Sequence, residues 1–246
     1  MTDQTISAAA KFDPARANEY AVQSRIALAG YDAFHELAAC VLSAALAGRS
    51  LPDILVVGAG GTGREIVVAG AIEPSWRFTA VDPSQPMMDQ AIAQVSDAGF
   101  AGRTTFHLGY VDDLPETDRF DAATLIGVVH HLPTDEAKLK AVSDVAARLK
   151  PGAPLILACN RHVYTTRPLF LSAWERRWKM FGATEQQAER KLATILQGAN
   201  PPVSEEAIAL LLAQAGFEPP MPFFSSLFWG AWIARRSASD APAPAS

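Results

Sequence analysis

Short apolar runs recur along the middle of the chain, and each is separated from the next by a segment long enough for a helix. The runs fall at residues 53–58, 77–82, 103–108, 121–127 and 153–159. Alternation of short strands with helices is typical of a parallel sheet that is covered on both faces. The pattern therefore predicts an α/β domain built around these five strands.

The segments on either side of this pattern add helices and a further strand. Residues 14–48 carry apolar positions with helical spacing and predict two helices broken near Gly30. Ser204 can N-cap a last helix that ends at Gly216, and residues 223–234 predict one long strand or a hairpin. Between the fifth strand and this helix, residues 160–202 form an insertion. It leaves from the carboxyl ends of the strands, where ligands bind in open α/β sheets, so we expect it to cover a pocket.

The chain is thus expected to form one decorated domain, since 246 residues lie within the range of a single α/β unit. We divide it into an N-terminal helical cap (1–50), a nucleotide-binding core (51–159), a helical lid (160–202), the last helix and strands of the core (203–236) and a disordered tail (237–246).

A glycine-rich turn follows the first apolar run, and Asp82 ends the second run. The turn contains Gly58, Gly60 and Gly63. A turn without side chains lets the backbone approach a ligand at a helix N-terminus, and a carboxylate at the next strand end can reach a ribose diol. These residues predict a site for an adenosine group. Taken alone, the glycine spacing also fits the dinucleotide fingerprint.

Three downstream segments distinguish between the two cofactor types. Residues 109–115, 120–133 and 149–157 resemble, in order and spacing, successive motifs of the class I S-adenosylmethionine-dependent methyltransferases. The resemblance extends over residues 12–236. It implies S-adenosylmethionine as cofactor and a Rossmann-like class I methyltransferase fold, with a mostly parallel seven-stranded sheet and helices on both faces. Two positions depart from the family pattern, because Val56 replaces a usual acidic residue and Thr62 replaces the usual third glycine.

The resemblance also implies which residues bind the cofactor. Asp82 would accept hydrogen bonds from the ribose hydroxyls, Met87 would pack on the adenine, and the backbone of Ile126 and Gly127 would accept from the methionine ammonium. The expected cofactor-binding residues are Arg25, Tyr31, Gly58, Ala59, Gly60, Asp82, Pro83, Met87, Tyr110, Val111, Ile126 and Gly127.

Arg25, Tyr31 and residues 201–206 further resemble the subgroup that includes the carboxy-S-adenosylmethionine synthase, in which an N-terminal helix folds over the cofactor. That synthase holds the added carboxylate with an arginine, where this chain has Ala193. We therefore expect the lidded architecture of the subgroup but not its carboxy-transfer reaction.

Candidates for the reaction itself lie near the predicted strand ends and in the lid. We expect His131 and Tyr164 as catalytic residues, because a histidine can remove a proton near neutrality and an aromatic ring can face a sulfonium. The candidate substrate-binding residues are Tyr20, Asn160, Arg161 and Arg167. The aromatic residues of one lid face, Phe170, Trp174, Trp178 and Phe181, are expected to pack in a core rather than line a pocket.

Composition limits the partners. A net charge of -5 and a pI of about 5.5 argue against a nucleic-acid partner, since such binding uses a basic surface. The chain has no apolar run of membrane-spanning length and no signal-peptide pattern at its start, so we expect a cytoplasmic protein with no membrane partner. Cys40 and Cys159 are expected as reduced core thiols, and no metal is expected because the histidines lack metal-ligand spacing.

The favoured function is a methyltransferase that acts on a small molecule by direct in-line transfer, as a monomer or a homodimer. Three alternatives stay open. One is a methyltransferase-like cyclase that converts S-adenosylmethionine to azetidine-2-carboxylate and methylthioadenosine. The others are an NAD-dependent oxidoreductase and an S-adenosylmethionine-binding protein without catalysis.

Overall fold

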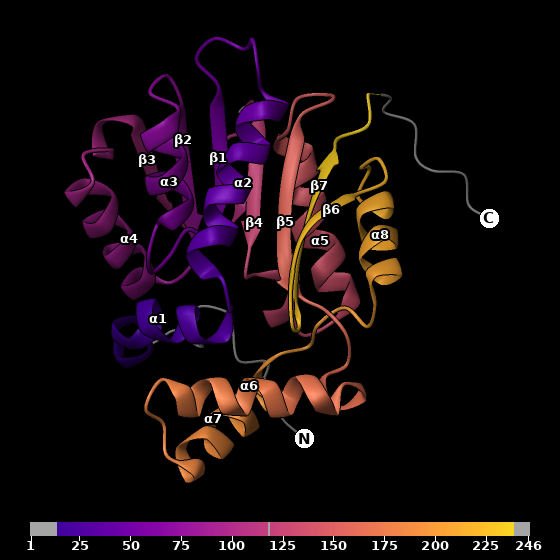
Figure 1. The fold of residues 1–246 in the computed structure, drawn as a ribbon. Coiled ribbons are helices and arrows are strands. Elements are labelled where there is room, and N and C mark those ends of the chain that lie inside the picture. Colours follow the sequence, from indigo (N-terminus) through magenta and orange to yellow (C-terminus); the bar gives the residue numbers. More distant parts are fainter. Residues whose placement is uncertain (1–13, 118, 239–246) are drawn as a thin grey trace, which may run out of the picture.

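A seven-stranded sheet with the order β3-β2-β1-β4-β5-β7-β6 forms the centre of the computed structural model, which describes residues 14–117 and 119–238 (Figure 1). β7 runs antiparallel to its neighbours β5 and β6, whereas the pairs among β1 to β5 are parallel. The strands are β1 (Asp53–Val57), β2 (Arg77–Asp82), β3 (Thr104–Leu108), β4 (Ala122–Ile126), β5 (Pro154–Asn160), β6 (Met221–Ser226) and β7 (Trp229–Arg235).

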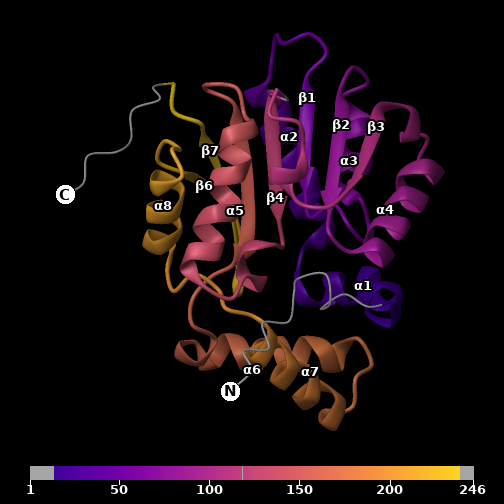
Figure 2. The same cartoon turned by 180° about the vertical axis from the view of Figure 1, so that it is seen from behind.

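Helices cover both faces of this sheet (Figures 1 and 2). Ile54 and Val56 of β1 pack in a cluster with α2 and α3, whereas Leu55 between them packs with α5 and α8 on the opposite face. Because side chains alternate across a strand, one apolar run supplies both cores. The covering helices are α2 (Tyr31–Ala45), α3 (Arg64–Ile72), α4 (Gln85–Asp97), α5 (Asp135–Arg148) and α8 (Glu205–Gln214).

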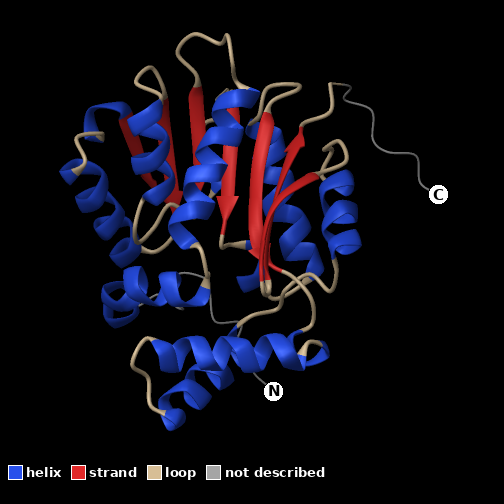
Figure 3. Ribbon diagram, viewed as in Figure 1, coloured by secondary structure: helices blue, strands red, loops and turns tan. Residues whose placement is uncertain are grey.

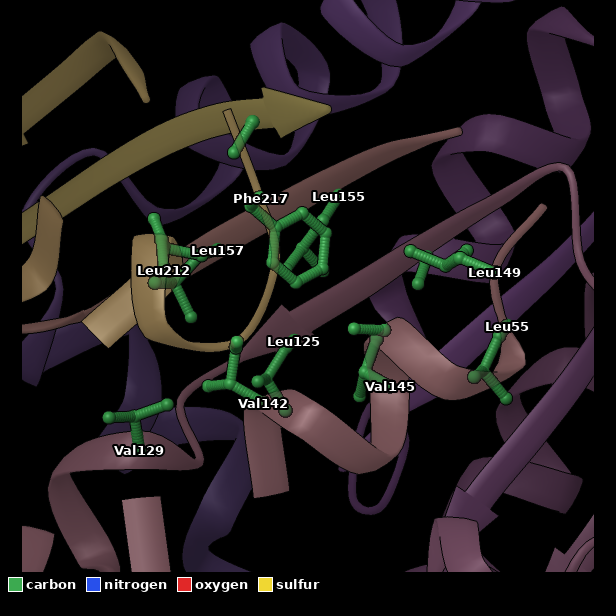
Figure 4. Close-up of a cluster of buried hydrophobic side chains, with 14 of the residues drawn as sticks. Leu55, Leu125, Val129, Val142, Val145, Leu149, Leu155, Leu157, Leu212 and Phe217 are labelled. Carbon is green, nitrogen blue, oxygen red and sulfur yellow. The ribbon is translucent and has the colours of Figure 1, made fainter. Parts of the chain in front are cut away.

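The core under α5 and α8 shows how the local sequence directs packing (Figure 4). Thr134 and Ser204 begin the two helices by accepting hydrogen bonds from backbone N–H groups three residues later. Val142 of α5 and Leu212 of α8 are then fully buried against Leu125 of β4. Each such side chain contributes about 1.5–3 kcal/mol through burial, so this face is rigidly attached to the sheet.

Three further helices lie beyond the carboxyl ends of the parallel strands (Figures 1 and 3). They are α1 (Pro14–Ala27), α6 (Pro168–Met180) and α7 (Glu185–Gly198). Trp174 of α6 donates its indole N–H to the Ala27 carbonyl at 2.7 Å, and Arg177 donates to the carbonyls of Ile26 (2.7 Å) and Arg25 (2.9 Å). The end of α1 is therefore capped by side chains of α6.

Short 3-10 helices connect the larger elements. They are η2 (Ala101–Arg103), which precedes β3, and η3 (Val111–Asp113), η4 (Val129–His131) and η5 (Tyr164–Thr166). η3, η4 and η5 follow β3, β4 and β5 respectively, so each places its side chains near the carboxyl end of a parallel strand. This edge is where an open α/β sheet binds its ligands.

The structure confirms the predicted fold class, the two N-terminal helices broken near Gly30, and the helical content of residues 160–202. The last apolar run forms a hairpin, β6 and β7. One expectation was wrong, because Cys40 is exposed on α2 while Cys159 alone is a core thiol. The predicted tail lies outside the described residues from 239 onward.

Within the described ranges, each helix taken singly is too short or too polar to cross a membrane. The segments Glu19–Ala27 and Tyr31–Ala45 meet the criterion of length and composition only as a pair, and they are bent by 83° where they meet.

Candidate functional site

Two adjoining cavities open at the carboxyl edge of the sheet. One, of about 410 Å³, lies against the glycine-rich turn, Asp82 and Met87, and we call it the turn cavity. The other, of about 240 Å³, lies under Tyr164, Trp174 and Trp178, and we call it the lid cavity. The two cavities share part of their lining, namely the six residues Tyr20, Gly58, Gly60, Ile126, Gly127 and His131. A ligand in one cavity can therefore contact a ligand in the other.

Asp82 and the glycine-rich turn form one rigid unit beside the turn cavity. One oxygen of the buried carboxylate accepts from the Gly60 N–H at 3.0 Å, and the other accepts from the Ser84 N–H at 2.9 Å. A Cβ atom at Gly60 would lie 2.5 Å from the same carboxylate and 2.5 Å from Met87 Cβ, so a side chain has no room there. Burial raises the pKa of Asp82. The turn thus holds the carboxylate at the cavity through backbone hydrogen bonds and close packing.

The position of Gly63 explains the altered glycine pattern. Gly63 has a φ of +52° as the N-cap of α3, and a Cβ there would lie 2.8 Å from Val95 of α4. This glycine therefore permits the close packing of α3 on α4 and does not line either cavity. Thr62 instead faces α2, where its hydroxyl lies 2.7 Å from the Tyr31 hydroxyl.

The remaining wall of the turn cavity is mostly apolar. Met87, Val111 and Leu125 line it, and Tyr110 lies at its exposed rim. Asp112 also lines it, but Lys140 donates to its carboxylate at 2.8 Å and lowers its pKa. A flat, weakly polar ring system matches such a wall, because apolar side chains can cover its faces.

The lid cavity combines aromatic walls with one polar corner. Asn160 donates its amide N–H to the Tyr164 hydroxyl at 2.8 Å, while its own amide oxygen is buried without a hydrogen-bond partner. The backbone N–H of Asn160 lies 3.3 Å from Nδ1 of His130, whose ring packs edge-on against Trp229. Burial raises the pKa of Tyr164, so its hydroxyl stays neutral. The corner therefore offers hydrogen bonds rather than charge.

Glu65 is a cavity-lining residue that our sequence-based predictions missed. It lies in the first turn of α3 and lines the lid cavity near Tyr31 and His35. Burial raises its pKa to about 7, and the charge of Asp82 adds to the effect. Burial also lowers the pKa of His35 to about 4 and raises that of Tyr31 to about 12, so both side chains are neutral near pH 7. Its place directly after the glycine-rich turn is a weak sequence signal, because an acidic residue is common in the first turn of any helix.

The structure brings most predicted site residues to the two cavities. The turn cavity is lined by Tyr20, Gly58, Gly60, Asp82, Pro83, Met87, Tyr110, Val111, Ile126, Gly127 and His131. The lid cavity adds Tyr31, Asn160 and Tyr164. Trp174 and Trp178 do both things that we treated as alternatives, since they are buried and also line the lid cavity.

Four predicted residues line neither cavity, namely Arg25, Ala59, Arg161 and Arg167. Arg25 is paired with Asp32 at 2.9 Å and lies over the Tyr31 ring, and Arg167 is exposed at the start of α6. Arg161 is buried and paired with Glu205 at 3.0 Å. Within residues 14–117 and 119–238, no cluster of three or more His, Cys, Asp and Glu side chains could hold a metal ion.

Arg161 is expected to stabilise the fold rather than bind substrate. Its guanidinium also donates to the Ser225 hydroxyl at 2.7 Å and to the Trp229 carbonyl, and thereby ties β5 to the hairpin. We predict that Arg161→Ala lowers the free energy of unfolding by about 2–4 kcal/mol, because it leaves buried acceptors unpaired. Urea denaturation measures this, with the exposed Arg167→Ala as the control. Equal stabilities of the two variants would contradict the assignment.

Residues 54–152 match the family described as "Methyltransferase domain". The fold is shared with an O-methyltransferase family protein from Burkholderia thailandensis (14% identity, TM-score 0.66), which aligns with 94% of this chain and 63% of its own. It is also shared with human N-acetylserotonin methyltransferase in complex with S-adenosylmethionine (16%, 0.61), over 96% of this chain and 60% of the human one. An O-methyltransferase family 2 protein from Planctomyces limnophilus in complex with apigenin (18%, 0.60) aligns over 80% and 55%.

Residues 54–152 thus match a methyltransferase domain, and the chain shares its fold with solved methyltransferases, one of them in complex with S-adenosylmethionine. The chain spans between 55% and 63% of the length of the three solved structures above. These comparisons do not confirm the resemblance to the carboxy-S-adenosylmethionine synthase subgroup.

The residues that line the turn cavity fit the adenosine part of this cofactor. Gly60 lets the turn pack closely on Asp82 and Met87, and both of these side chains line the cavity beside it. Each oxygen of Asp82 accepts one backbone hydrogen bond and retains a lone pair for a ribose hydroxyl. Met87 and Val111 supply apolar surface for the adenine.

Proposed function

We propose that the protein is an S-adenosylmethionine-dependent methyltransferase that acts on a small molecule by direct in-line transfer. The adjoining turn and lid cavities carry this proposal. The shared wall of Gly58, Gly60, Ile126 and Gly127 sets the cofactor site directly beside an aromatic-lined space of about 240 Å³, which suits an acceptor of modest size.

The residues of this chain would contribute mainly through position. When bound, S-adenosylmethionine supplies an electrophilic methyl group on a sulfonium. Asp82 would hold the ribose and Met87 the adenine, while the backbone carbonyls of Ile126 and Gly127 border the junction of the cavities. Holding two reactants in line lowers the barrier by removing the entropic cost of their encounter. α1 and α6 contact each other beyond the carboxyl ends of the strands, where they would limit the access of water to the junction.

The lid cavity favours an acceptor with an apolar, ring-shaped body and a hydroxyl or amine group. Trp174, Trp178 and Trp229 provide the apolar wall, and the unpartnered Asn160 amide oxygen needs a donor. The solved structures with the same fold include one in complex with apigenin and one of a methyltransferase named for N-acetylserotonin, and both of these compounds contain rings. His131 lines both cavities and is the candidate to take up the acceptor proton.

The proposal is tested by incubating the purified protein with isotope-labelled S-adenosylmethionine and a panel of hydroxylated and aminated aromatic compounds. Mass spectrometry should detect an acceptor that gains one labelled methyl group, together with S-adenosylhomocysteine in equal amount. Release of methylthioadenosine in the absence of any acceptor would contradict methyl transfer and indicate cyclisation of the cofactor. Binding of NAD in place of S-adenosylhomocysteine would contradict the cofactor assignment.

We predict that Asn160→Ala lowers turnover of an accepted substrate about 10- to 100-fold, because the substrate loses a buried hydrogen bond and Tyr164 loses its partner. The dissociation constant for S-adenosylhomocysteine should stay within about twofold, since we assign Asn160 to the acceptor and to no part of the cofactor. Steady-state kinetics and calorimetry measure the two effects. Asn200→Ala is the matched control, because Asn200 is exposed and bonds only to backbone, through Pro133 and His130. Unchanged turnover in Asn160→Ala would remove this residue from the acceptor site.

A further inference from the structure

Glu65 places a carboxyl group in the wall of the lid cavity close to the turn cavity. It follows Gly63 by two residues, at the first turn of α3, and the cavity wall continues from it to Gly58 and Gly60 of the shared wall. The charge of Glu65 raises the pKa of Tyr20 and of Tyr31, and the charge of Asp82 raises the pKa of Glu65, so these groups lie near one another. Glu65 therefore lines the cavity that adjoins the proposed ribose position at Asp82, where the methionine part of the cofactor would extend.

The cations near Glu65 are engaged elsewhere. Arg64 and Arg25 both pair with Asp32, at 3.2 Å and 2.9 Å. Lys191, which also lines the lid cavity, pairs with Glu19 at 3.5 Å. Among the ion pairs of the described part of the chain, none includes Glu65. A partly buried carboxyl that lacks a cationic partner and faces a cavity is complementary to a cationic ligand group.

We infer that Glu65 binds the ammonium of the methionine part of the cofactor, as a carboxylate that acts together with the backbone carbonyls at Ile126 and Gly127. This inference rests on the proposed function. It assigns to the first turn of α3 the negative charge that Val56 does not supply at the end of β1. The position also separates two tasks, since Asp82 selects the ribose while Glu65 selects the charged amino acid.

The experiment compares S-adenosylhomocysteine with its deaminated analogue, which keeps the adenosine and the carboxylate but lacks the ammonium. Calorimetry should show that the wild-type protein binds S-adenosylhomocysteine about 10- to 100-fold more tightly than the analogue. Glu65→Gln should bind the two compounds with nearly equal affinity, while its affinity for the analogue stays at the wild-type value. Glu36→Gln, which changes an exposed glutamate on α2, is the matched control and should keep the full preference.

The pH dependence gives a second measurement that needs no folded variant. The ammonium binds the ionised carboxyl, so affinity should rise as pH increases through the pKa of about 7 and level off above it. Between about pH 6 and pH 8 we expect a gain of about tenfold for S-adenosylhomocysteine and none for the analogue. The other titratable groups that line this region are Asp82 from β2, His35 and Tyr31 from α2, Glu19 and Tyr20 from α1, His130 and His131 from η4, and Lys191 from α7. The two compounds share the adenosine and the carboxylate, so the difference in their affinities reports on the ammonium and on Glu65.

Two results would overturn the inference. The first is a Glu65→Gln variant that still prefers S-adenosylhomocysteine to the deaminated analogue. The second is a wild-type preference that does not change across this pH range, which applies even when the variant is unstable. Failure of the wild-type protein to bind either compound is a separate outcome, because it would contradict the proposed function itself.

Discussion

Asp82→Ala is expected to abolish most of the affinity for S-adenosylhomocysteine. The change removes two charge-assisted hydrogen bonds to the ribose and also the acceptors for the Gly60 and Ser84 N–H groups. Each lost interaction of this kind costs about 1–2 kcal/mol, so binding should weaken by about 2–4 kcal/mol, or about 30- to 1,000-fold. Calorimetry with the purified variant measures the loss.

The control for this variant is Asp97→Ala, which removes an exposed carboxylate at the end of α4. A thermal melt of both proteins separates loss of the site from loss of the fold. A folded Asp82→Ala protein that binds S-adenosylhomocysteine as tightly as the wild type would place the ribose elsewhere. The affinity of Asp82→Asn for S-adenosylhomocysteine should lie between those of Asp82→Ala and the wild type, since the amide keeps one acceptor for the turn.

Gly60→Ala is the second change with a large expected effect. The added methyl group would lie 2.5 Å from both the Asp82 carboxylate and Met87 Cβ, closer than folded proteins tolerate. The turn must then move, so we expect a loss of about 1–3 kcal/mol in the free energy of unfolding. Affinity for S-adenosylhomocysteine should fall at least about tenfold, because the methyl group displaces Asp82 and Met87, which line the turn cavity. Denaturation in urea and calorimetry report the two losses.

Gly102→Ala provides the comparison, because a Cβ atom at Gly102 has no heavy atom of the described structure within 4 Å. It tests whether glycine replacement alone alters the protein. If Gly60→Ala retained both stability and affinity, the glycine-rich turn would have space that its present geometry does not show.

The strands and the adenosine side of the site were predictable because each depends on a short run of sequence. Residues 54–57 are apolar on both faces of a strand, and the turn after them exposes backbone at a helix N-terminus. Asp82 follows at the end of the neighbouring strand, β2, which pairs with β1 in parallel. These local features place the glycine-rich turn and the carboxylate together in any sheet with this strand order.

The roles of the arginines were not predictable, because they depend on contacts between distant segments. Arg161 is separated from Ser225 by 64 residues and from Trp229 by 68. Because of these partners, a residue that we expected to bind substrate instead connects β5 to the hairpin.

Glu65 is a residue of the candidate site that its local sequence did not indicate. Its sequence neighbours suggest an ordinary first-turn glutamate at a helix N-terminus, and only the assembly of α1, α2 and β4 around it creates the cavity.

The capping of α1 by α6 has a consequence for the order of folding. The carbonyls of Arg25, Ile26 and Ala27 find their donors in side chains that lie 147 to 152 residues further along the chain. During synthesis, the last turn of α1 lacks these donors until α6 has left the ribosome. All five parallel strands, β1 to β5, are made before that point. The last turn of α1 therefore acquires these partners later than the parallel strands acquire theirs, although α1 lies before all of them in the sequence.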